Sequence, residues 1–171
     1  MRSWFDLRSA RLRSGEEHRE AVEVALEPLT IGGQRYLPVP ERVEAGLTVT
    51  QAATGQVFAL AFAGRLHGPC YRCLADAVVD LPIRAREYQA TNPGDSDELR
   101  TPYLVDGRID LGSWARDALV LALPEKILCR PDCAGLCPVC GRDLNREPHV
   151  HEEAEVDSRW AALAELREQL R

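Results

Sequence analysis

The first half of the chain alternates between hydrophobic and polar residues. In the segment 21–27, the apolar residues Val22, Val24 and Leu26 are separated by glutamate or alanine. A period of two is typical of a β-strand that has one face in the core and one in solvent. The pattern recurs as far as residue 90, so the region 21–90 is expected to consist of β-strands.

A hairpin is expected where two alternating segments meet. Residues 47–51 and 56–66 flank the short sequence Ala-Ala-Thr-Gly at 52–55, which suits a tight connection between strands. In the second segment the large apolar side chains share one face, and the other face carries mostly alanine. Because alanine is also apolar, we expect both faces of this strand to be covered.

A second hairpin is expected around the sequence Cys-Tyr-Arg-Cys at 70–73. Residues 79–86 alternate again between apolar and charged side chains, so this cysteine pair has an alternating segment on each side. The pair is therefore expected at the hairpin tip, where Gly-Pro at 68–69 introduces it. Residues 89–102 break the alternation with proline, glycine and acidic residues, which predicts a polar loop.

Two helices are expected in the second half of the chain. Asp110 can cap a helix whose apolar face includes Trp114, and Pro124 ends that helix. A second helix is expected near the C-terminus, with Asp157 or Ser158 as its cap and an apolar stripe at helical spacing.

Together these elements predict an α+β fold. Its body is antiparallel and β-rich, either a sheet or a partly open barrel, with one central helix, one C-terminal helix and a zinc-knuckle region. Residues 1–128 are expected to form the body, including the cysteine pair at the hairpin tip and the amphipathic helix. Residues 129–171 carry the cysteine-rich loop and the last helix, and we expect them to pack with the body as one domain. A length of 171 residues is ordinary for one domain.

The composition and the first residues of the chain indicate the cellular compartment in which the protein is expected. Hydrophobic residues make up 45% of the chain and charged residues 28%, as in an ordinary globular protein. The sequence contains no run of about 18 apolar residues. Its first residues lack the apolar region of a signal peptide. A cytoplasmic protein without a membrane segment is therefore expected.

The net charge of −6 bears on possible partners. A domain that envelops nucleic acid usually carries excess positive charge, because neutralising phosphates and releasing their counterions supplies much of its affinity. Arginines gather near the N-terminus, and Arg84 and Arg86 lie two residues apart. Such groups are most often a solvated face, and we interpret them in that way.

The cysteines carry the strongest chemical signal. Four of the six lie between residues 129 and 140, as Cys-Arg-Pro-Asp-Cys and Cys-Pro-Val-Cys. Thiolates two or three residues apart can point at one tetrahedral zinc ion, and the proline and following glycine of the second pair favour a tight turn. In a reducing compartment, clustered cysteines favour metal over disulfides. The pattern therefore predicts one or two zinc ions.

Six cysteines do not fill two four-ligand sites, but two histidines bring the donors to eight. One partition assigns a first zinc to Cys70, Cys73, Cys129 and Cys133. It assigns a second zinc to Cys137, Cys140, His149 and His151. In the rival partition the four cysteines of 129–140 share one metal, and the pair at 70–73 is free or a half-site. The first partition is favoured because a knuckle pair usually recruits a second pair from elsewhere in the chain. It also closes a loop of more than fifty residues, where a metal clip adds useful stability.

Full cysteine coordination favours a structural zinc, since it leaves no position open for water. Two enzyme motifs match the order of residues in this sequence but not the structural context that each motif requires. His-Arg-Glu at 18–20 with Pro-Cys-x-x-Cys at 69–73 is similar to a cytidine-deaminase signature, and the same cysteine pair is similar to a thioredoxin-like redox motif. Both chemistries place the cysteines at the start of a helix, whereas the sequence that follows residue 73 is of strand type. A protein without enzymatic activity is therefore expected.

Several motifs together resemble those of a known family. They are Cys-Tyr-Arg-Cys-Leu at 70–74, Leu-Ala-Leu-Pro at 121–124, the cysteine segment 129–141 with Leu-Asn at 144–145, and Asp-Ser-Arg-Trp at 157–160. In this order they resemble the YceD family, the large ribosomal RNA subunit accumulation proteins of bacteria and plastids. One departure is His-Val-His at 149–151, where many relatives would have Cys-x-Cys.

The resemblance implies a ribosome-biogenesis factor that supports accumulation of large-subunit (23S) ribosomal RNA. Some branches of the family lack the cysteines, which implies that zinc holds the structure and is not the activity. With the acidic charge, this suggests action through a ribosomal protein or a large-subunit precursor, with no small-molecule substrate. Local contact with ribosomal RNA or a partner is expected at Arg72, Arg130 and Arg142. A zinc-ribbon RNA-binding module is the alternative, followed by an enzyme with a catalytic or redox cysteine centre.

Overall fold

A computed structural model of the chain describes residues 3–10, 12–94 and 96–151. The chain divides into two compact units, Met1–Cys133 and Ala134–Arg171. Within the described residues, all strands and the single α-helix belong to the first unit. No helix among these residues is long and apolar enough to cross a membrane. The division after residue 128, and the packing of the two parts as one domain, stay predictions.

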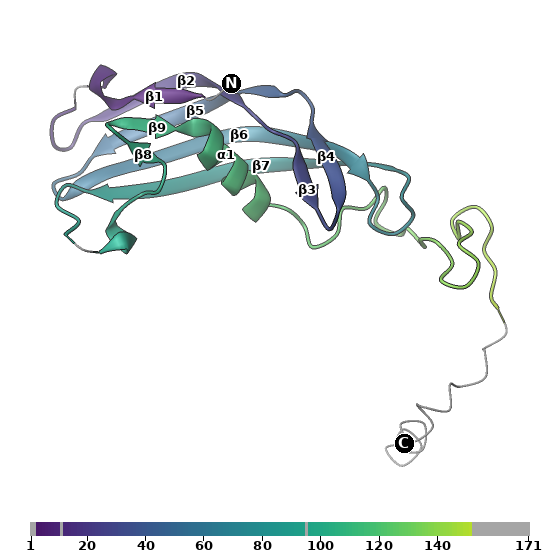
Figure 1. Ribbon diagram of the computed structural model, residues 1–171. Coiled ribbons are helices and arrows are strands. Elements are labelled where there is room, and N and C mark those ends of the chain that lie inside the picture. Colours follow the sequence, from purple (N-terminus) through teal and green to yellow (C-terminus); the bar gives the residue numbers. More distant parts are fainter. Residues whose placement is uncertain (1–2, 11, 95, 152–171) are drawn as a thin grey trace, which may run out of the picture. The chain divides into compact units, whose positions relative to one another are not determined.

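The first unit is built on a six-stranded antiparallel sheet (Figure 1). Its strands are β2 (Glu17–Ala25), β3 (Leu29–Ile31), β4 (Gln34–Pro38), β5 (Arg42–Gln51), β6 (Gly55–Pro69) and β7 (Asp76–Ala90). Their order is β2-β5-β6-β4-β3, and β7 pairs along the whole length of β6. Among the described residues no strand pairing joins the two edges of this sheet, and the antiparallel β-rich body is as expected.

A smaller sheet of order β1-β9-β8 accompanies the large one. Its strands are β1 (Trp4–Asp6), β8 (Leu104–Val105) and β9 (Arg108–Asp110). The helix α1 (Leu111–Leu121) follows β9 directly, and short 3₁₀ turns occupy Leu7–Ser9 and Asp97–Leu99. The small strands have two or three residues each, too few to carry a recognisable alternation, and they were not predicted.

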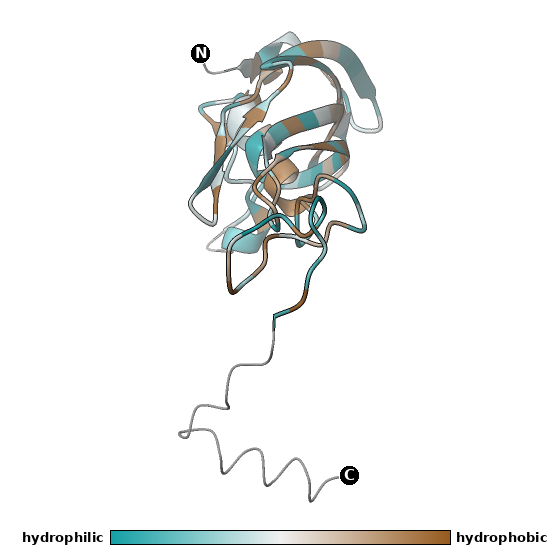
Figure 2. Cartoon of the chain, turned by 90° about the vertical axis from the view of Figure 1, so that its right-hand side faces the viewer, coloured by the Kyte–Doolittle hydropathy of each residue, from teal (hydrophilic) through white to brown (hydrophobic). Residues whose placement is uncertain are grey.

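Both expected hairpins are confirmed. β5 and β6 are joined at residues 52–54, and β6 and β7 at residues 70–75, so the first cysteine pair lies at a hairpin tip. Figure 2 shows the bands of apolar and polar residues that this alternation produces along the strands. β2 and β5 begin earlier than expected, and β7 continues to Ala90, inside the region predicted as a polar loop.

The core lies between the inner face of the sheet and α1. Phe58, Leu60 and Leu66 of β6 are buried on that face. The helix begins as expected, because the Asp110 carboxylate accepts a hydrogen bond of 3.1 Å from the backbone N–H of Ser113. α1 lies over one side of the sheet (Figure 1).

The other face of β6 differs from the prediction. Ala61 and Ala63 are exposed, so only one face of this strand is covered. Alanine is small enough to be left in water at little cost, and its apolar character alone did not indicate burial. The predicted C-terminal helix, with its cap at residue 157 or 158, lies outside the described residues. One α-helix is therefore established where two were expected.

Gly68 provides a test of the packing beside the hairpin tip. A Cβ at this position would overlap the buried ring of Tyr36, whose hydroxyl donates to the carbonyl of Pro69 at 2.9 Å. We expect Gly68→Ala to lower the free energy of unfolding by about 1–3 kcal/mol. Gly46→Ala is the matched control, because its Cβ would meet nothing closer than the Ala61 carbonyl at 3.9 Å. Urea unfolding monitored by circular dichroism measures both, and equal losses would contradict this packing.

Candidate metal centres

The first ligand pair is shaped by the turn between β6 and β7. The backbone N–H of Cys70 donates to the Ala75 carbonyl at 2.7 Å, and that of Leu74 donates to the Cys70 carbonyl at 3.0 Å. The N–H of Arg72 points at the Cys70 sulfur, 3.4 Å away. The turn therefore directs both cysteine side chains to one side, and the backbone N–H of Arg72 faces the Cys70 sulfur.

The second pair comes from the segment after α1, and backbone contacts hold it against the turn. The N–H of Tyr71 donates to the Ile127 carbonyl at 2.8 Å. The Arg72 guanidinium donates to the Cys133 carbonyl at 2.6 Å. The segment that carries Cys129 and Cys133 is thus joined to the hairpin tip by protein contacts as well as through the cysteines.

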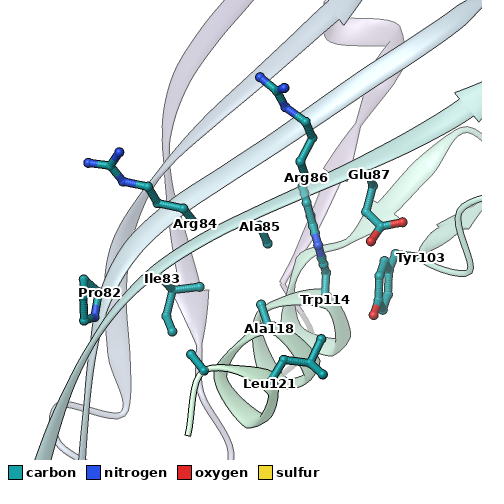
Figure 3. A pocket seen from close by; sticks show the side chains of 11 residues that line it. Pro82, Ile83, Arg84, Ala85, Arg86, Glu87, Tyr103, Trp114, Ala118 and Leu121 are labelled. Carbon is teal, nitrogen blue, oxygen red and sulfur yellow. The ribbon is translucent and has the colours of Figure 1, made fainter.

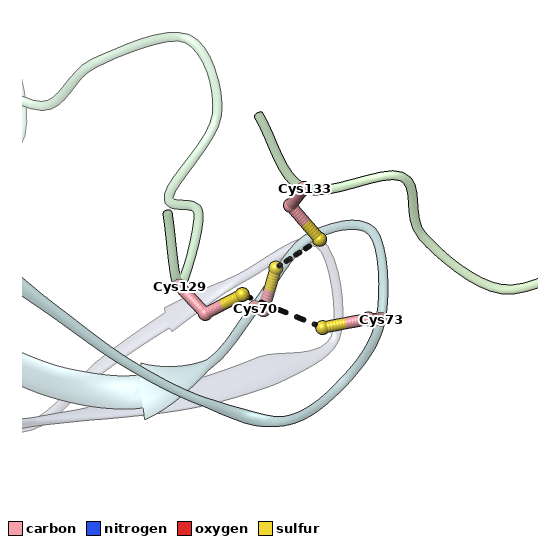
Figure 4. Close-up of side chains that lie close together, drawn as sticks. All are labelled: Cys70, Cys73, Cys129 and Cys133. Atoms are coloured by element: carbon pink, nitrogen blue, oxygen red, sulfur yellow. Dashed lines mark hydrogen bonds between the residues drawn. The ribbon is translucent and has the colours of Figure 1, made fainter. Parts of the chain in front are cut away.

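These four sulfurs form a compact cluster (Figure 4). The Cys70 and Cys133 sulfurs are 3.8 Å apart, and those of Cys73 and Cys129 are 3.6 Å apart. All four lie within 4.8 Å of one another. Four sulfurs at about 2.3 Å from one tetrahedral zinc are separated by about 3.8 Å, so the donor set fits this metal. A site closed by four thiolates has no coordination position left for water or substrate.

The electrostatics of the cluster also favour a cation. Burial opposes ionisation of Cys70, but backbone N–H groups of Cys73, Cys129 and Arg72 outweigh it and lower the pKa of Cys70 to about 6. Burial and the neighbouring cysteines raise the pKa of Cys129 to about 12. Without a cation, the crowded sulfurs therefore hold some of their protons, because negative charges this close repel. A divalent cation removes that repulsion.

The second unit contains a similar turn. The N–H of Gly141 donates to the Cys137 carbonyl at 2.9 Å, as Leu74 does to Cys70 in the first turn. Gly141 has φ of 74° and Leu74 has φ of 62°, so both turns place a left-handed residue directly after the second cysteine. Glycine adopts this conformation without strain, whereas leucine does not. The backbone of the first turn is therefore the more strained of the two.

His149 is oriented toward the second cysteine pair. Its Nδ1 donates to the Glu147 carbonyl at 2.7 Å, so in the neutral ring Nε2 carries no proton and can bind a metal. That Nε2 lies 3.1 Å from the Cys140 sulfur. The rings of His149 and His151 are 4.9 Å apart, and the donor atoms of Cys137, Cys140 and both histidines lie within 4.8 Å of one another. This set of two sulfurs and two nitrogens also suits tetrahedral zinc.

The structure groups the eight candidate ligands as in the first partition of the sequence analysis. Their binding of metal stays a prediction. Sequence reasoning missed the contacts that support the first group, notably the hydrogen bond between Tyr71 and Ile127. It joins backbone groups of residues 56 positions apart, and no local pattern of residue types indicates it.

The three arginines expected to contact RNA or a partner each lie beside a cluster and make local contacts. Arg72 donates to the Cys133 carbonyl, and its role in positioning the two halves of the first cluster was not predicted. Arg130 forms an ion pair with Asp132 at 3.4 Å. In the second unit, Arg142 pairs with Glu147 at 3.2 Å. Arg130 and Arg142 are at least half exposed, and their contact with RNA stays a prediction.

The fold and these clusters define a small β-rich protein with two preformed four-donor groups of cysteine and histidine. A family model described as "Large ribosomal RNA subunit accumulation protein YceD" matches residues 58–167. The chain belongs to this family, as its motifs indicated. The matched segment contains all eight candidate metal ligands.

Comparison with curated proteins identifies mycobacterial relatives. Uncharacterized proteins of Mycobacterium bovis and Mycobacterium tuberculosis are each 36% identical over 150 residues, which is 85% of this chain and 69% of theirs. An uncharacterized protein of Mycobacterium leprae is 35% identical over 103 residues, which is 57% of this chain and 46% of that protein. No solved structure matches this chain.

Proposed function

We propose that this protein is a non-enzymatic factor of bacterial large-subunit biogenesis that supports accumulation of 23S ribosomal RNA. Membership in the YceD family, over a segment that includes both clusters, is the observation that carries the proposal. In this proposal each cluster binds one zinc ion, and the metal maintains the structure that a partner recognises. The protein acts in the cytoplasm.

The donor sets support a structural role for the metal. Each cluster offers four protein ligands, which completes a tetrahedral shell. Catalytic zinc usually has three protein ligands and an open position that activates water. The bound ions would therefore act as cross-links, and catalysis has no coordination site in either cluster.

The charge of the chain supports action through a ribosomal protein or an assembly intermediate. A net charge of −6 opposes extensive contact with RNA phosphates. Arg72 donates to the Cys133 carbonyl, so its guanidinium is less available for phosphate. Contact with ribosomal RNA would then be local, at the exposed side chains of Arg130 and Arg142.

Removal of the gene tests this function. We expect cells without the protein to contain less 23S relative to 16S ribosomal RNA, because large-subunit precursors that lack an assembly factor are degraded. The epitope-tagged protein should sediment with large-subunit precursors in a sucrose gradient. Northern blotting measures the RNA ratio, and a plasmid copy of the gene is the control that restores it. An unchanged ratio together with sedimentation only at the top of the gradient would contradict the proposal.

A further inference from the structure

One edge of the large sheet is open. Among the residues that the structure describes, β7 pairs with β6 alone, so its other side has no neighbouring strand. An exposed edge presents backbone N–H and C=O groups to any extended chain that approaches. Such an edge can accept a further strand from a partner, with main-chain hydrogen bonds giving affinity and side-chain pockets giving specificity.

The hairpin register shows which residues of β7 face this edge. Hydrogen bonds from Thr91 to Thr54 and from Cys70 to Ala75 lie at the two ends of the hairpin, and the pairing between them is continuous. Because backbone groups alternate sides in an antiparallel strand, the odd-numbered residues of β7 bond to β6 and the even-numbered ones face outward. Pro82 is an even-numbered residue, and proline without an N–H is tolerated where the N–H would face solvent.

A groove runs along this edge between β7 and α1 (Figure 3). Its volume is about 610 Å³, and one wall is apolar, with Ile83 and Ala85 of β7 opposite Trp114, Ala118 and Leu121 of the helix. Leu121 is 87% exposed and Ala85 is partly exposed, whereas Ile83, Trp114 and Ala118 are buried behind them, so Ala85 and Leu121 are the apolar residues of this wall that face water. A strand added to β7 would place every second side chain against the helix.

Arg84 and Arg86 lie on the face of β7 that is turned away from the apolar wall of the groove. Figure 3 shows their side chains pointing away from the helix, on the opposite face of the strand from Ile83 and Ala85. Both are exposed, and within the described part of the chain neither makes an ion pair or a hydrogen bond through its side chain. Acidic side chains on an added strand, directly opposite these two arginines, would pair with them.

We propose that the edge of β7 at residues 82–86 binds an extended segment of a partner protein with the pattern acidic–apolar–acidic. The two acidic residues lie opposite Arg84 and Arg86, and the apolar residue between them lies opposite Ala85, on the helix side of the strand. Glu87 lies beside Tyr103 on the helix side of the groove, so an acidic residue is disfavoured among the side chains that point toward the helix. This inference goes beyond the role in ribosomal RNA accumulation and does not depend on it.

In the register that centres on residue 85, a second copy of the chain is a poorer occupant. If two β7 edges paired antiparallel around residue 85, Arg84 of one copy would lie opposite Arg86 of the other, and like charges directly opposite destabilise a sheet. The separate acidic segment has no such conflict. Because these arginines do not contribute to the buried core, their substitution leaves the fold intact.

Fluorescence anisotropy with the zinc-loaded full chain tests this proposal. The probe is a labelled nine-residue peptide with Glu-Val-Glu at its centre, flanked by threonine and serine. We expect saturable binding, weakened about tenfold or more by the double substitution Arg84→Glu and Arg86→Glu. A peptide with Lys-Val-Lys at its centre should instead prefer that double variant. Arg19→Glu, a charge reversal at an exposed arginine of β2, is the matched control and should leave binding unchanged.

Backbone pairing gives a second readout. Addition of the Glu-Val-Glu peptide should slow hydrogen exchange of the Arg84 and Arg86 amides, which face outward, relative to the free protein. Absence of saturable binding, or binding that the double variant does not weaken, would overturn the proposal. So would single-stranded RNA binding through these arginines without peptide binding, or a dimer in light scattering that the double variant abolishes.

Discussion

We expect Cys133→Ala to remove one of two zinc ions per chain and to lower the free energy of unfolding of the first unit by about 4 kcal/mol. Cys133 is fully buried in the first cluster, and the two ligand pairs that it helps to join are 56 residues apart at Cys73 and Cys129. A cross-link that closes a loop of this length stabilises a folded chain by about 4 kcal/mol through chain entropy. The loss corresponds to a decrease in Tm of about 10 °C.

Cys140→Ala is the matched control for this experiment. It also removes one thiolate and one expected zinc ion, but Cys140 belongs to the second unit. Its effect on unfolding of the β-sheet should therefore be small. Elemental analysis gives the metal per chain, and thermal unfolding monitored in the β-sheet region of the circular dichroism spectrum gives Tm. Equal decreases in Tm for both variants, or two zinc ions in both, would refute the division of ligands.

Trp114→Ala is expected to lower the free energy of unfolding by about 3–5 kcal/mol, the usual cost of truncating a buried tryptophan. Trp114 is 2% exposed and its ring is stacked with that of Tyr103 at 6.1 Å between centroids. It is a principal contact of α1 with the rest of the first unit. Its removal leaves a cavity that the two β-sheets cannot collapse to fill without moving the helix.

Leu121→Ala at the end of the same helix is the control for the loss of Trp114. Its side chain is 87% exposed, so we expect a change of no more than about 0.5 kcal/mol. Urea unfolding monitored by circular dichroism is suitable for both variants, because it does not depend on tryptophan fluorescence. A large effect at Leu121 with a small one at Trp114 would mean that α1 packs through its other face.

The long elements of the fold could be predicted because their patterns extend over many residues. β6 and β7 have fifteen residues each, and an alternation of that length is hard to produce in any other element. The strands β8 and β9 are two or three residues long, and pairing partners, not local sequence, create them. The exposed alanines of β6 show a different difficulty, since a small apolar residue is compatible with either environment.

The grouping of candidate ligands could be predicted by counting donors, because a tetrahedral site requires four and the chain supplies eight. The supporting contacts could not be predicted. Arg72 lies between two cysteines, where the sequence predicts contact with RNA or a partner, and its guanidinium also donates a hydrogen bond to the Cys133 carbonyl. Only the three-dimensional approach of the hairpin tip to the segment after α1 reveals that role. For Arg84 and Arg86 of β7 the sequence likewise predicts only a solvated face. The strand register adds that their backbone groups face the unpaired edge of the sheet.

The distance along the chain between the two halves of the first cluster affects the order of events during synthesis. The pair at 70–73 is made 60 residues before Cys133, which at about 5–20 residues per second is ~3–12 s earlier. The nascent hairpin therefore presents two unpaired thiols during that interval, while the donors at 137–151 follow one another closely and can capture metal together. Oxidation or binding of the wrong metal is a greater hazard for the first pair, because its proposed ligand set is complete only after Cys133 has been made.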